Sequence, residues 1–579
     1  MTATVTRITG TLAEARPLRD AGLYELVRVG ARGLLGEIIR FNADTATLQL
    51  FEDTTGLEVG APVVATGASL VAELGPGLLG SVLDGVGRPL ATLAAHHGDF
   101  ITPGASATLL DHQRRWQFHA SLQPGATVNA GDVLGTVEEQ NGFVHRVLVP
   151  RQYAGTLAAL ADGSYTVDEP IGQLADGTPL TLAQRWAIRT PRPVARRLPA
   201  NQPLVTGQRI FDLLFPIAEG GTVAVPGGFG TGKTIVEHSL AKYAAADVIV
   251  FVGCGECGNE MAEVLHDFAK LVDPRTNRPL MERTVLVVNT SNMPVVAREA
   301  SVYLGITIGE YYRDMGYRVA VMVDSLSRWA EALRDIAARL QEMPGEEGYP
   351  TYMASRLGAL YERAGRADAI GAPARTGAVT LVCAVSPPGG DFSEPVTQAS
   401  LRVAGGLWAL DAQLARARQF PAVQWSTSYS LYVDSVAAAL SSTAGTSWQQ
   451  LRTRVLALLQ RESELREIAS LLGAEEMDDR DRLVLSIASM VREHLLGQNA
   501  FDRNDAMSSL TKTARLATTA IEILDAADAR LVTGADLEDI PLVPLRRAYA
   551  ELRRAAPENE DARAEDLATL IATLRGGAS

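Results

Sequence analysis

The segment Gly227 to Thr234 has the residue types and spacing of a phosphate-binding loop. It reads Gly-Gly-Phe-Gly-Thr-Gly-Lys-Thr and fits the pattern G-x-x-x-x-G-K-[ST]. Glycines let successive backbone N–H groups turn toward phosphate oxygens, and the N-terminus of a following helix adds partial positive charge. The candidate nucleotide-binding residues of this loop are Gly227, Gly228, Phe229, Gly230, Thr231, Gly232, Lys233 and Thr234.

The residues around this loop predict the structure that such a loop needs. The apolar stretch Thr222–Val225 predicts a short buried strand, and apolar residues at helical spacing from Thr234 predict a helix. In that setting Lys233 can reach the β- and γ-phosphates, and the Thr234 hydroxyl can bind Mg²⁺. The sequence therefore predicts binding of a nucleoside triphosphate.

Two further predicted strands end in carboxylates. The run Val319–Val323 leads into Asp324, which we expect to support Mg²⁺ beside the phosphate loop. Another strand ends at Gly253-Cys-Gly-Glu256, where a carboxylate could position water for attack on the γ-phosphorus. The alternative for Glu256 is a carboxylate that caps the next helix, and spacing alone does not separate the two.

The composition indicates a soluble globular chain without features of a membrane span or a secretory signal. Its 579 residues allow three or four domains, with 47% hydrophobic and 21% charged residues. A net charge of −14 argues against nucleic-acid binding. The three cysteines, Cys254, Cys257 and Cys383, fit a reducing cytosol.

Periodicity divides the chain into a multidomain α/β protein. Residues 1–75 alternate apolar and polar residues between turns and predict a small β-barrel. Residues 76–109 and 191–430 alternate strands and helices, which predicts a parallel sheet covered on both faces. Residues 110–190 predict a β-rich insert, and residues 431–579 a helical domain.

The insert contains wording similar to a lipoyl or biotinyl carrier domain at residues 125–135. Such a carrier needs a lysine to modify, and no lysine occurs before Lys233. We therefore expect the insert to be structural.

Four longer motifs carry a family resemblance. They are Gly253-Cys-Gly-Glu-Cys-Gly-Asn-Glu-Met261, Asn289-Thr-Ser-Asn-Met-Pro294, Asp324-Ser-Leu-Ser-Arg-Trp-Ala-Glu-Ala332 and Ser386-Pro-Pro-Gly-Gly-Asp391. Together with Phe229 and the insert, they resemble the catalytic A subunit of V/A-type rotary ATP synthases and ATPases. The resemblance covers the whole chain and implies a RecA-like P-loop nucleotide domain. Neither the sister B subunit nor the F-type subunits contain the insert.

The resemblance implies a role for each matching residue. Lys233 and Thr234 would bind phosphate and Mg²⁺, Asp324 would support the metal, and Glu256 would position the attacking water. Arg328 would approach the phosphates of ATP or ADP. Phe420 and Phe501 resemble an aromatic pair that clamps adenine, and their alternative is ordinary core packing.

The resemblance also implies partners. Three copies would alternate with three non-catalytic B subunits in an A₃B₃ hexamer, and each B subunit would contribute an arginine finger. Central and peripheral stalk subunits would link the ring to a membrane ion-translocating sector, so the chain would lie at the cytoplasmic face of the cell membrane.

One position departs from the family wording. Cys257 stands where the family has an arginine that helps to bind the γ-phosphate, and a thiol supplies neither its charge nor its forked donors. Smaller departures are Gly228 for proline and Leu326 for threonine. Three hypotheses follow: a working subunit with a weakened phosphate clamp, a ring subunit that binds nucleotide but turns over poorly, and a Cys254–Cys257 redox switch.

An RNA translocase of the same superfamily is the alternative from another class, and the acidic charge argues against it. The sequence leaves open whether synthesis or hydrolysis dominates and whether the ion is H⁺ or Na⁺.

Overall fold

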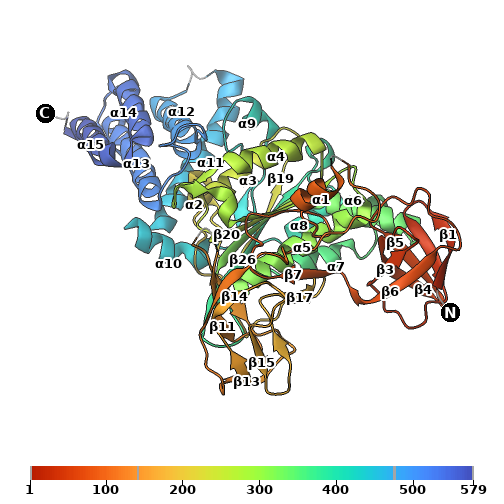
Figure 1. Ribbon diagram of the computed structural model, residues 1–579. Coiled ribbons are helices and arrows are strands. Elements are labelled where there is room, and N and C mark those ends of the chain that lie inside the picture. Colours follow the sequence, from red (N-terminus) through yellow and green to blue (C-terminus); the bar gives the residue numbers. More distant parts are fainter. Residues whose placement is uncertain (1–2, 99, 140–141, 474–476, 577–579) are drawn as a thin grey trace. The chain divides into compact units, whose positions relative to one another are not determined.

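The computed structural model describes residues 3–98, 100–139, 142–473 and 477–576. The chain forms two compact units, which Figure 1 shows coloured along the sequence. The first unit comprises Met1–Pro199, Ala246–Pro387 and Asp391–Val403, and the second comprises Ala200–Ala245, Pro388–Gly390 and Ala404–Ser579. The domain boundaries expected from periodicity differ from this division and stay a prediction.

The N-terminal segment is a closed barrel, as predicted. Its strands pair in the order β1-β2-β5-β4-β3-β6. Alternate side chains point inward, so Val27, Val29, Ile38 and Leu48 are fully buried in the barrel core. The strands are β1 (Ala3–Thr9), β2 (Leu12–Arg16), β3 (Glu25–Val29), β4 (Leu34–Asn42), β5 (Thr45–Leu50) and β6 (Pro62–Ser69).

The predicted insert consists of two small antiparallel sheets in the orders β10-β13-β15-β16 and β12-β11-β9-β14. A buried histidine, His145, joins it to the rest of the first unit through hydrogen bonds with Glu139 (3.1 Å) and Tyr311 (2.9 Å). Its strands are β9 (Trp116–Ala120), β10 (Thr127–Val128), β11 (Val133–Glu138), β12 (Val144–Leu148), β13 (Gly155–Leu160), β14 (Gly163–Tyr165), β15 (Gly172–Leu174) and β16 (Pro179–Leu180).

The first unit also contains parallel strands in the order β26-β24-β20-β23-β8, with β25 and β18 added antiparallel beyond β26. The four predicted apolar runs are strands of this sheet, and they are buried along nearly their whole length because helices cover both faces. The strands are β8 (Val82–Asp84), β18 (Arg196–Leu198), β20 (Val248–Glu256), β23 (Thr284–Thr290), β24 (Arg318–Asp324), β25 (Gly365–Asp368) and β26 (Thr376–Val385).

The helices of the first unit include α5, which is buried on all sides. They are α1 (Leu90–His97), α4 (Gly258–Lys270), α5 (Val295–Asp314), α6 (Leu326–Arg339), α7 (Met353–Tyr361) and α8 (Pro395–Val403). Two short pairs complete it, β7 (Val71–Leu74) with β17 (Gln184–Ala187) and β21 (Val272–Asp273) with β22 (Arg278–Pro279).

The second unit begins with α2 (Arg209–Leu214), β19 (Thr222–Pro226) and α3 (Lys233–Tyr243). Strand β19 pairs in parallel with β27 (Gly406–Leu407), which pairs with β28 (Tyr429–Ser430), and the short helix α9 (Ala412–Arg416) lies between these two strands in sequence.

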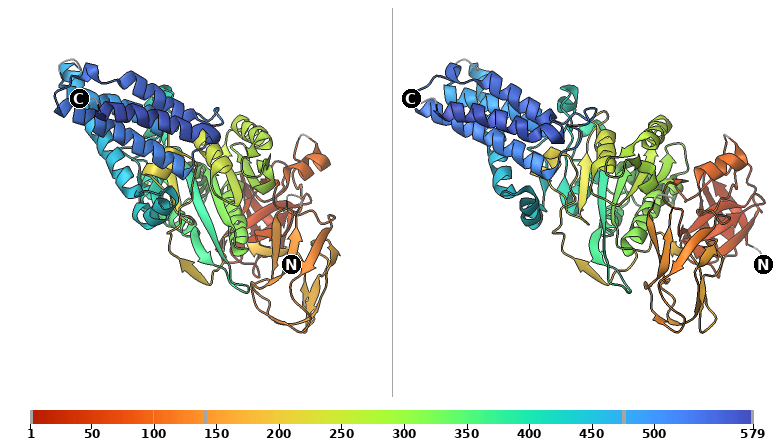
Figure 2. Two further views of the ribbon diagram at one scale, coloured as in Figure 1. Left: turned by 90° about the vertical axis from the view of Figure 1, so that its left-hand side faces the viewer. Right: turned by 60° about the vertical axis from the view of Figure 1, so that its left-hand side comes forward.

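From Val433 onward the described chain is helical, which confirms the predicted C-terminal helical region. Figure 2 shows these blue helices lying side by side. They are α10 (Val433–Ala444), α11 (Trp448–Leu472), α12 (Asp479–Met490), a π-helix (Val491–Leu496), α13 (Leu510–Val532), α14 (Leu542–Arg554) and α15 (Glu560–Gly576). Among the described residues, none of the helices has the length and hydropathy required to cross a bilayer.

Candidate functional site

The phosphate loop lies between the end of β19 and the start of α3, in the strand–loop–helix setting predicted from sequence. Gly230 and Gly232 have positive φ angles of 75° and 88°, which favour glycine. A Cβ atom on Gly227 would come within 2.5 Å of the Thr231 hydroxyl oxygen, so the close approach also needs glycine there. Thr231 closes the turn by donating a hydrogen bond to the Gly228 carbonyl at 2.9 Å.

Lys233 points back into this loop. Its ammonium group donates hydrogen bonds to the carbonyl oxygens of Gly227 at 2.7 Å and Gly228 at 3.0 Å. Lys233 and Thr234 are the first two residues of α3, where backbone N–H groups lack helical partners and the helix dipole favours an anion. A narrow glycine turn, a cation and a hydroxyl at a helix N-terminus fit a polyphosphate with its metal ion.

The predicted aromatic residues also lie in the second unit. Phe420 lies beside the loop, because a Cβ built on Gly232 would be 3.4 Å from its ring. Its carbonyl oxygen accepts a hydrogen bond from the Gln498 N–H at 2.7 Å, so the segment leading to Phe501 lies next to it. Phe501 is 100% exposed and Phe229 is 93% exposed. Core packing is therefore wrong for Phe501, and adenine contact stays a prediction for both members of the pair.

The two predicted carboxylates lie in the first unit, on neighbouring strands. Asp324 ends β24 and pairs with Gly253 of β20, which runs on to end at Glu256. Asp324 is buried, with 5% of its surface exposed, and Glu256 is half-buried. Helix α4 begins after Cys257, and no side chain caps its N-terminus. The capping alternative for Glu256 is therefore wrong.

Arg328 packs against the turn before Glu256. A Cβ on Gly255, whose φ is 75°, would lie 2.9 Å from the Cβ of Arg328. The Arg328 guanidinium pairs with Glu331 at 3.0 Å. Burial opposes its charge, but the Glu331 carboxylate outweighs burial and raises the pKa of Arg328. Arg328 therefore carries a fixed positive charge near this turn.

A second arginine at this turn, Arg298 of α5, was missed in the sequence analysis. It is 8% exposed and donates a hydrogen bond to the Ser291 carbonyl at 2.9 Å. A Cβ on Gly255 would lie 2.7 Å from its Cδ, and the Ser291 N–H donates to the Glu256 carbonyl at 2.9 Å. Arg298 thus supports the backbone around Glu256. The signal was an arginine in a helix that is otherwise apolar at its start.

The three cysteines are reduced thiols with different surroundings. Cys254 is fully buried, and burial raises its pKa to about 12. Cys257 is exposed at the start of α4, and Cys383 is buried in β26. Among the described residues, no group of three or more His, Cys, Asp or Glu side chains could hold a metal ion by itself. A metal at this site would therefore need oxygen atoms from a bound phosphate or water.

Comparison with known families matches four consecutive segments. Residues 5–67 match the beta-barrel domain of the ATP synthase alpha/beta family, and residues 107–189 match its barrel-sandwich domain. Residues 207–430 match the nucleotide-binding domain of that family, and residues 440–540 match the C-terminal domain of V and A type ATP synthase.

Similar proteins match over nearly the whole chain. The V-type ATP synthase alpha chain of Anaeromyxobacter dehalogenans strain 2CP-1 is 53% identical over 540 residues, which cover 93% of each chain. In Methanospirillum hungatei, the second A subunit of the A-type ATP synthase is 49% identical, covering 96% of this chain and 94% of the relative. The ATPase EscN of the enteropathogenic E. coli type III secretion system shares the fold, with a TM-score of 0.64, 21% identity and coverage of 90% of this chain and 100% of EscN.

Proposed function

The chain belongs to the ATP synthase alpha/beta family as a catalytic A subunit of the V/A type, and we propose that it couples ATP synthesis or hydrolysis to H⁺ or Na⁺ transport. The observation that carries the chemistry is the phosphate loop, with Gly230 and Gly232 at positive φ and the Lys233 ammonium turned inward.

In this proposal the phosphate loop binds the phosphates of ATP or ADP. Lys233 neutralises charge on the β- and γ-phosphates, and backbone N–H groups at the start of α3 receive phosphate oxygens. Thr234 and Asp324 would hold Mg²⁺, which neutralises charge that develops during phosphoryl transfer. The oxygen chemistry of a hydroxyl and a carboxylate suits this hard cation.

Glu256 would position and polarise the water that attacks the γ-phosphorus. The half-buried carboxylate ends a buried strand, and the backbone around it is supported by Arg298. Arg328 would approach the phosphates with its fixed positive charge. Phe420 and Phe501 would contact adenine, with Phe420 already beside the phosphate loop.

The proposed assembly is a ring of three A subunits alternating with three B subunits. The neighbouring B subunit would complete the active site with an arginine finger, and stalk subunits would transmit rotation to a membrane sector at the cytoplasmic face. We expect no nucleic acid to take part.

A second candidate function is a ring subunit that binds nucleotide but turns over poorly. The exposed Cys257 favours it, because the thiol contributes no charge to a phosphate site. Arg328, which packs at the same turn, favours a working site.

The decisive experiment reconstitutes the chain with a B subunit of a close relative and measures ATP hydrolysis with and without Mg²⁺. We expect Glu256→Gln to lower kcat by at least about 10²-fold while ATP still binds. Lys233→Ala should instead weaken ATP binding itself. A Glu256→Gln ring with the wild-type rate would refute the catalytic role of Glu256, and a wild-type ring without activity would favour the second candidate.

A further inference from the structure

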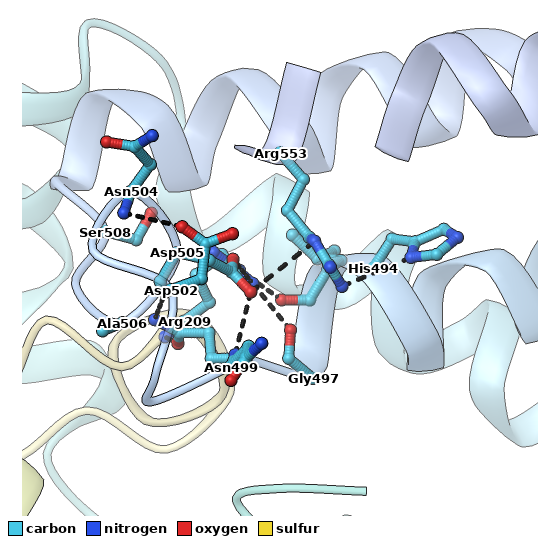
Figure 3. A network of polar contacts seen from close by, with 12 residues as sticks. Arg209, His494, Gly497, Asn499, Asp502, Asn504, Asp505, Ala506, Ser508 and Arg553 are labelled. Carbon is cyan, nitrogen blue, oxygen red and sulfur yellow. Dashed lines mark hydrogen bonds and ion pairs between the residues drawn. The ribbon is translucent and has the colours of Figure 1, made fainter. Parts of the chain in front are cut away.

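The segment 497–508, here called the base loop, carries Phe501 between the π-helix and α13. Two buried arginines and one buried aspartate hold it, as Figure 3 shows. Arg209 comes from α2 and Arg553 from α14, while Asp505 belongs to the loop itself. All of these residues lie in the second unit, together with the phosphate loop.

Arg209 holds the start of the base loop. Its side chain is 0% exposed, and its Nε donates to the Leu495 carbonyl at 2.6 Å. Its Nη2 donates to the Gly497 carbonyl at 2.6 Å and to Asp505 Oδ1 at 2.8 Å. Carbonyl groups at the end of a helix lack helical partners, and a cation there is favourable. Arg209 therefore fixes the point at which the chain leaves the π-helix.

Asp505 holds the rest of the loop from inside. Its carboxylate is 0% exposed, and Oδ2 accepts a hydrogen bond from the Asn499 N–H at 2.8 Å. Arg553 lies on the other side, with its Nε 3.6 Å from Oδ2, and donates through Nη1 to the Glu493 carbonyl at 3.0 Å. Two buried cations thus share one carboxylate, and removal of that carboxylate would leave both charges uncompensated.

His494 adds to the same side of the network. Burial, with the charge of Arg553 adding to it, lowers the pKa of His494 to about 4. The neutral ring nitrogen Nδ1 lies 3.3 Å from Arg553 Nη1 and can accept from it. Arg553 is thereby oriented toward the base loop at neutral pH.

The base loop connects to the nucleotide side of the unit through Gln498. Its N–H donates to the Phe420 carbonyl at 2.7 Å, its Oε1 accepts from the Arg209 N–H, and its Nε2 donates to the Gly207 carbonyl at 3.1 Å. A Cβ on Gly207 would lie 3.2 Å from the Cβ of Tyr243, the last residue of α3. The loop is therefore anchored to both Phe420 and the phosphate-loop helix.

We propose that Arg209 and Asp505 are positioning residues for recognition of the nucleotide base. They touch no phosphate-loop residue; they fix the base loop so that the exposed ring of Phe501 is presented at a constant place near Phe420. A ring that is 100% exposed gains nothing from core packing, so its position depends on how its loop is held. This inference rests on the proposed function, since it assumes that the second unit binds ATP.

The test compares two ligands on the full-length chain: Mg-ATP, which has a base, and Mg-tripolyphosphate, which does not. Loss of base stacking weakens binding by about tenfold, so Asp505→Asn should weaken Mg-ATP by about that factor and leave Mg-tripolyphosphate unchanged. Equal weakening of both ligands would overturn the proposal, and so would unchanged binding of both.

A matched control separates positioning from general loss of stability. Glu462 of α11 is also a buried carboxylate, 3% exposed, and pairs with Arg492 of the π-helix at 2.8 Å. We expect Glu462→Gln to lower the thermal unfolding temperature as Asp505→Asn does, but to keep the wild-type preference for Mg-ATP. Loss of that preference in Glu462→Gln would overturn a specific role for Asp505.

If Asp505→Asn does not fold, Arg553→Lys answers the same question, because it retains the charge while altering the contact with Asp505. A spectroscopic readout accompanies both variants: in a Phe501→Trp background, a freed base loop lowers the fluorescence anisotropy of Trp before any ligand is added. Unchanged anisotropy would overturn the proposal. Failure of the proposed function would look different, because Mg-ATP would then bind Lys233→Ala as tightly as the wild type.

Discussion

The thiol of Cys254 donates a hydrogen bond to the carbonyl oxygen of Arg298, with 3.4 Å between sulfur and oxygen. This contact lies inside the first unit, where Cys254 is 0% exposed and burial raises its pKa to about 12. Cys257, on the exposed start of α4, lies in different surroundings. Because the thiolate is the reactive form of cysteine, Cys254 is inert at neutral pH.

We therefore expect the ATPase rate to be insensitive to mild oxidants such as diamide. Oxidant can modify the exposed Cys257, but a bond to the buried Cys254 needs the turn to open. The measurement compares wild type and Cys257→Ser with oxidant and then with reductant. A rate that oxidant abolishes and reductant restores in the wild type, but not in Cys257→Ser, would establish the redox switch.

Replacing Cys257 with arginine should raise turnover. An arginine can contribute about 10³-fold to phosphoryl transfer, but Arg328 and Lys233 already supply positive charge, so we expect a rise of about tenfold in kcat. Cys257→Ser is the matched neutral control and should keep the wild-type rate. No change in Cys257→Arg would show that this position does not act on the phosphates. A wild-type rate near zero that Cys257→Arg restores would favour the weakly catalytic subunit.

Arg328 and Glu331 form a pair whose members should differ in effect. Arg328→Gln removes a cation beside the turn that ends at Glu256, and we expect kcat to fall by about 10²-fold. Glu331→Gln keeps a hydrogen-bond acceptor for Arg328 and should leave kcat near the wild-type value. Steady-state rates of both variants check this. Equal losses would mean that the ion pair is needed only for stability.

The barrel should lose stability as pH rises from about 4.5 to about 7. Burial raises the pKa of Glu37 from 4.5 to about 7, and Arg189 offsets this only in part because it also pairs with the buried Glu299. The folded state keeps a proton that the unfolded chain releases above pH 4.5. The stabilisation from that proton is therefore complete below about pH 4.5 and lost as pH passes about 7, at most roughly 3 kcal/mol.

Glu37→Gln should remove this decline, because glutamine cannot ionise. Chemical denaturation of the full-length chain at about pH 5, 6, 7 and 8 measures it. The control is Glu14→Gln, whose exposed partner Arg7 lies 3.9 Å away, and we expect it to keep the wild-type pH dependence. The prediction is wrong if Glu37→Gln and the wild type show the same slope.

Much of the architecture could be predicted from local pattern. The alternation of residues 1–75 is a property of each strand separately, so it predicted the barrel before any pairing was known. The run ending in Asp324 and the glycine spacing of 227–234 likewise depend on short stretches of sequence, and both lie in the elements expected of them. The division of the chain into two compact units was not predicted, because it depends on contacts between distant segments.

The environment of individual side chains was less predictable. Cys254 and Cys257 are three residues apart, yet one ends buried against Arg298 and the other exposed, because the strand ends between them. For Phe501 the sequence allowed either core packing or a ligand contact, and only its full exposure excluded the first. Arg298 was missed because nothing local distinguishes it from other helical arginines.

The sequence by itself determined the phosphate loop, the carboxylates at the strand ends, the family and the departure at Cys257, since each is written in contiguous residues. Only the tertiary structure decided that Arg209 meets Asp505, which lies 296 residues away along the chain. A contact of that kind depends on helix ends and a loop being brought to one buried place. Its physical cause is the cost of burying a charge, which makes each cation find the carboxylate and carbonyl groups that packing leaves within reach.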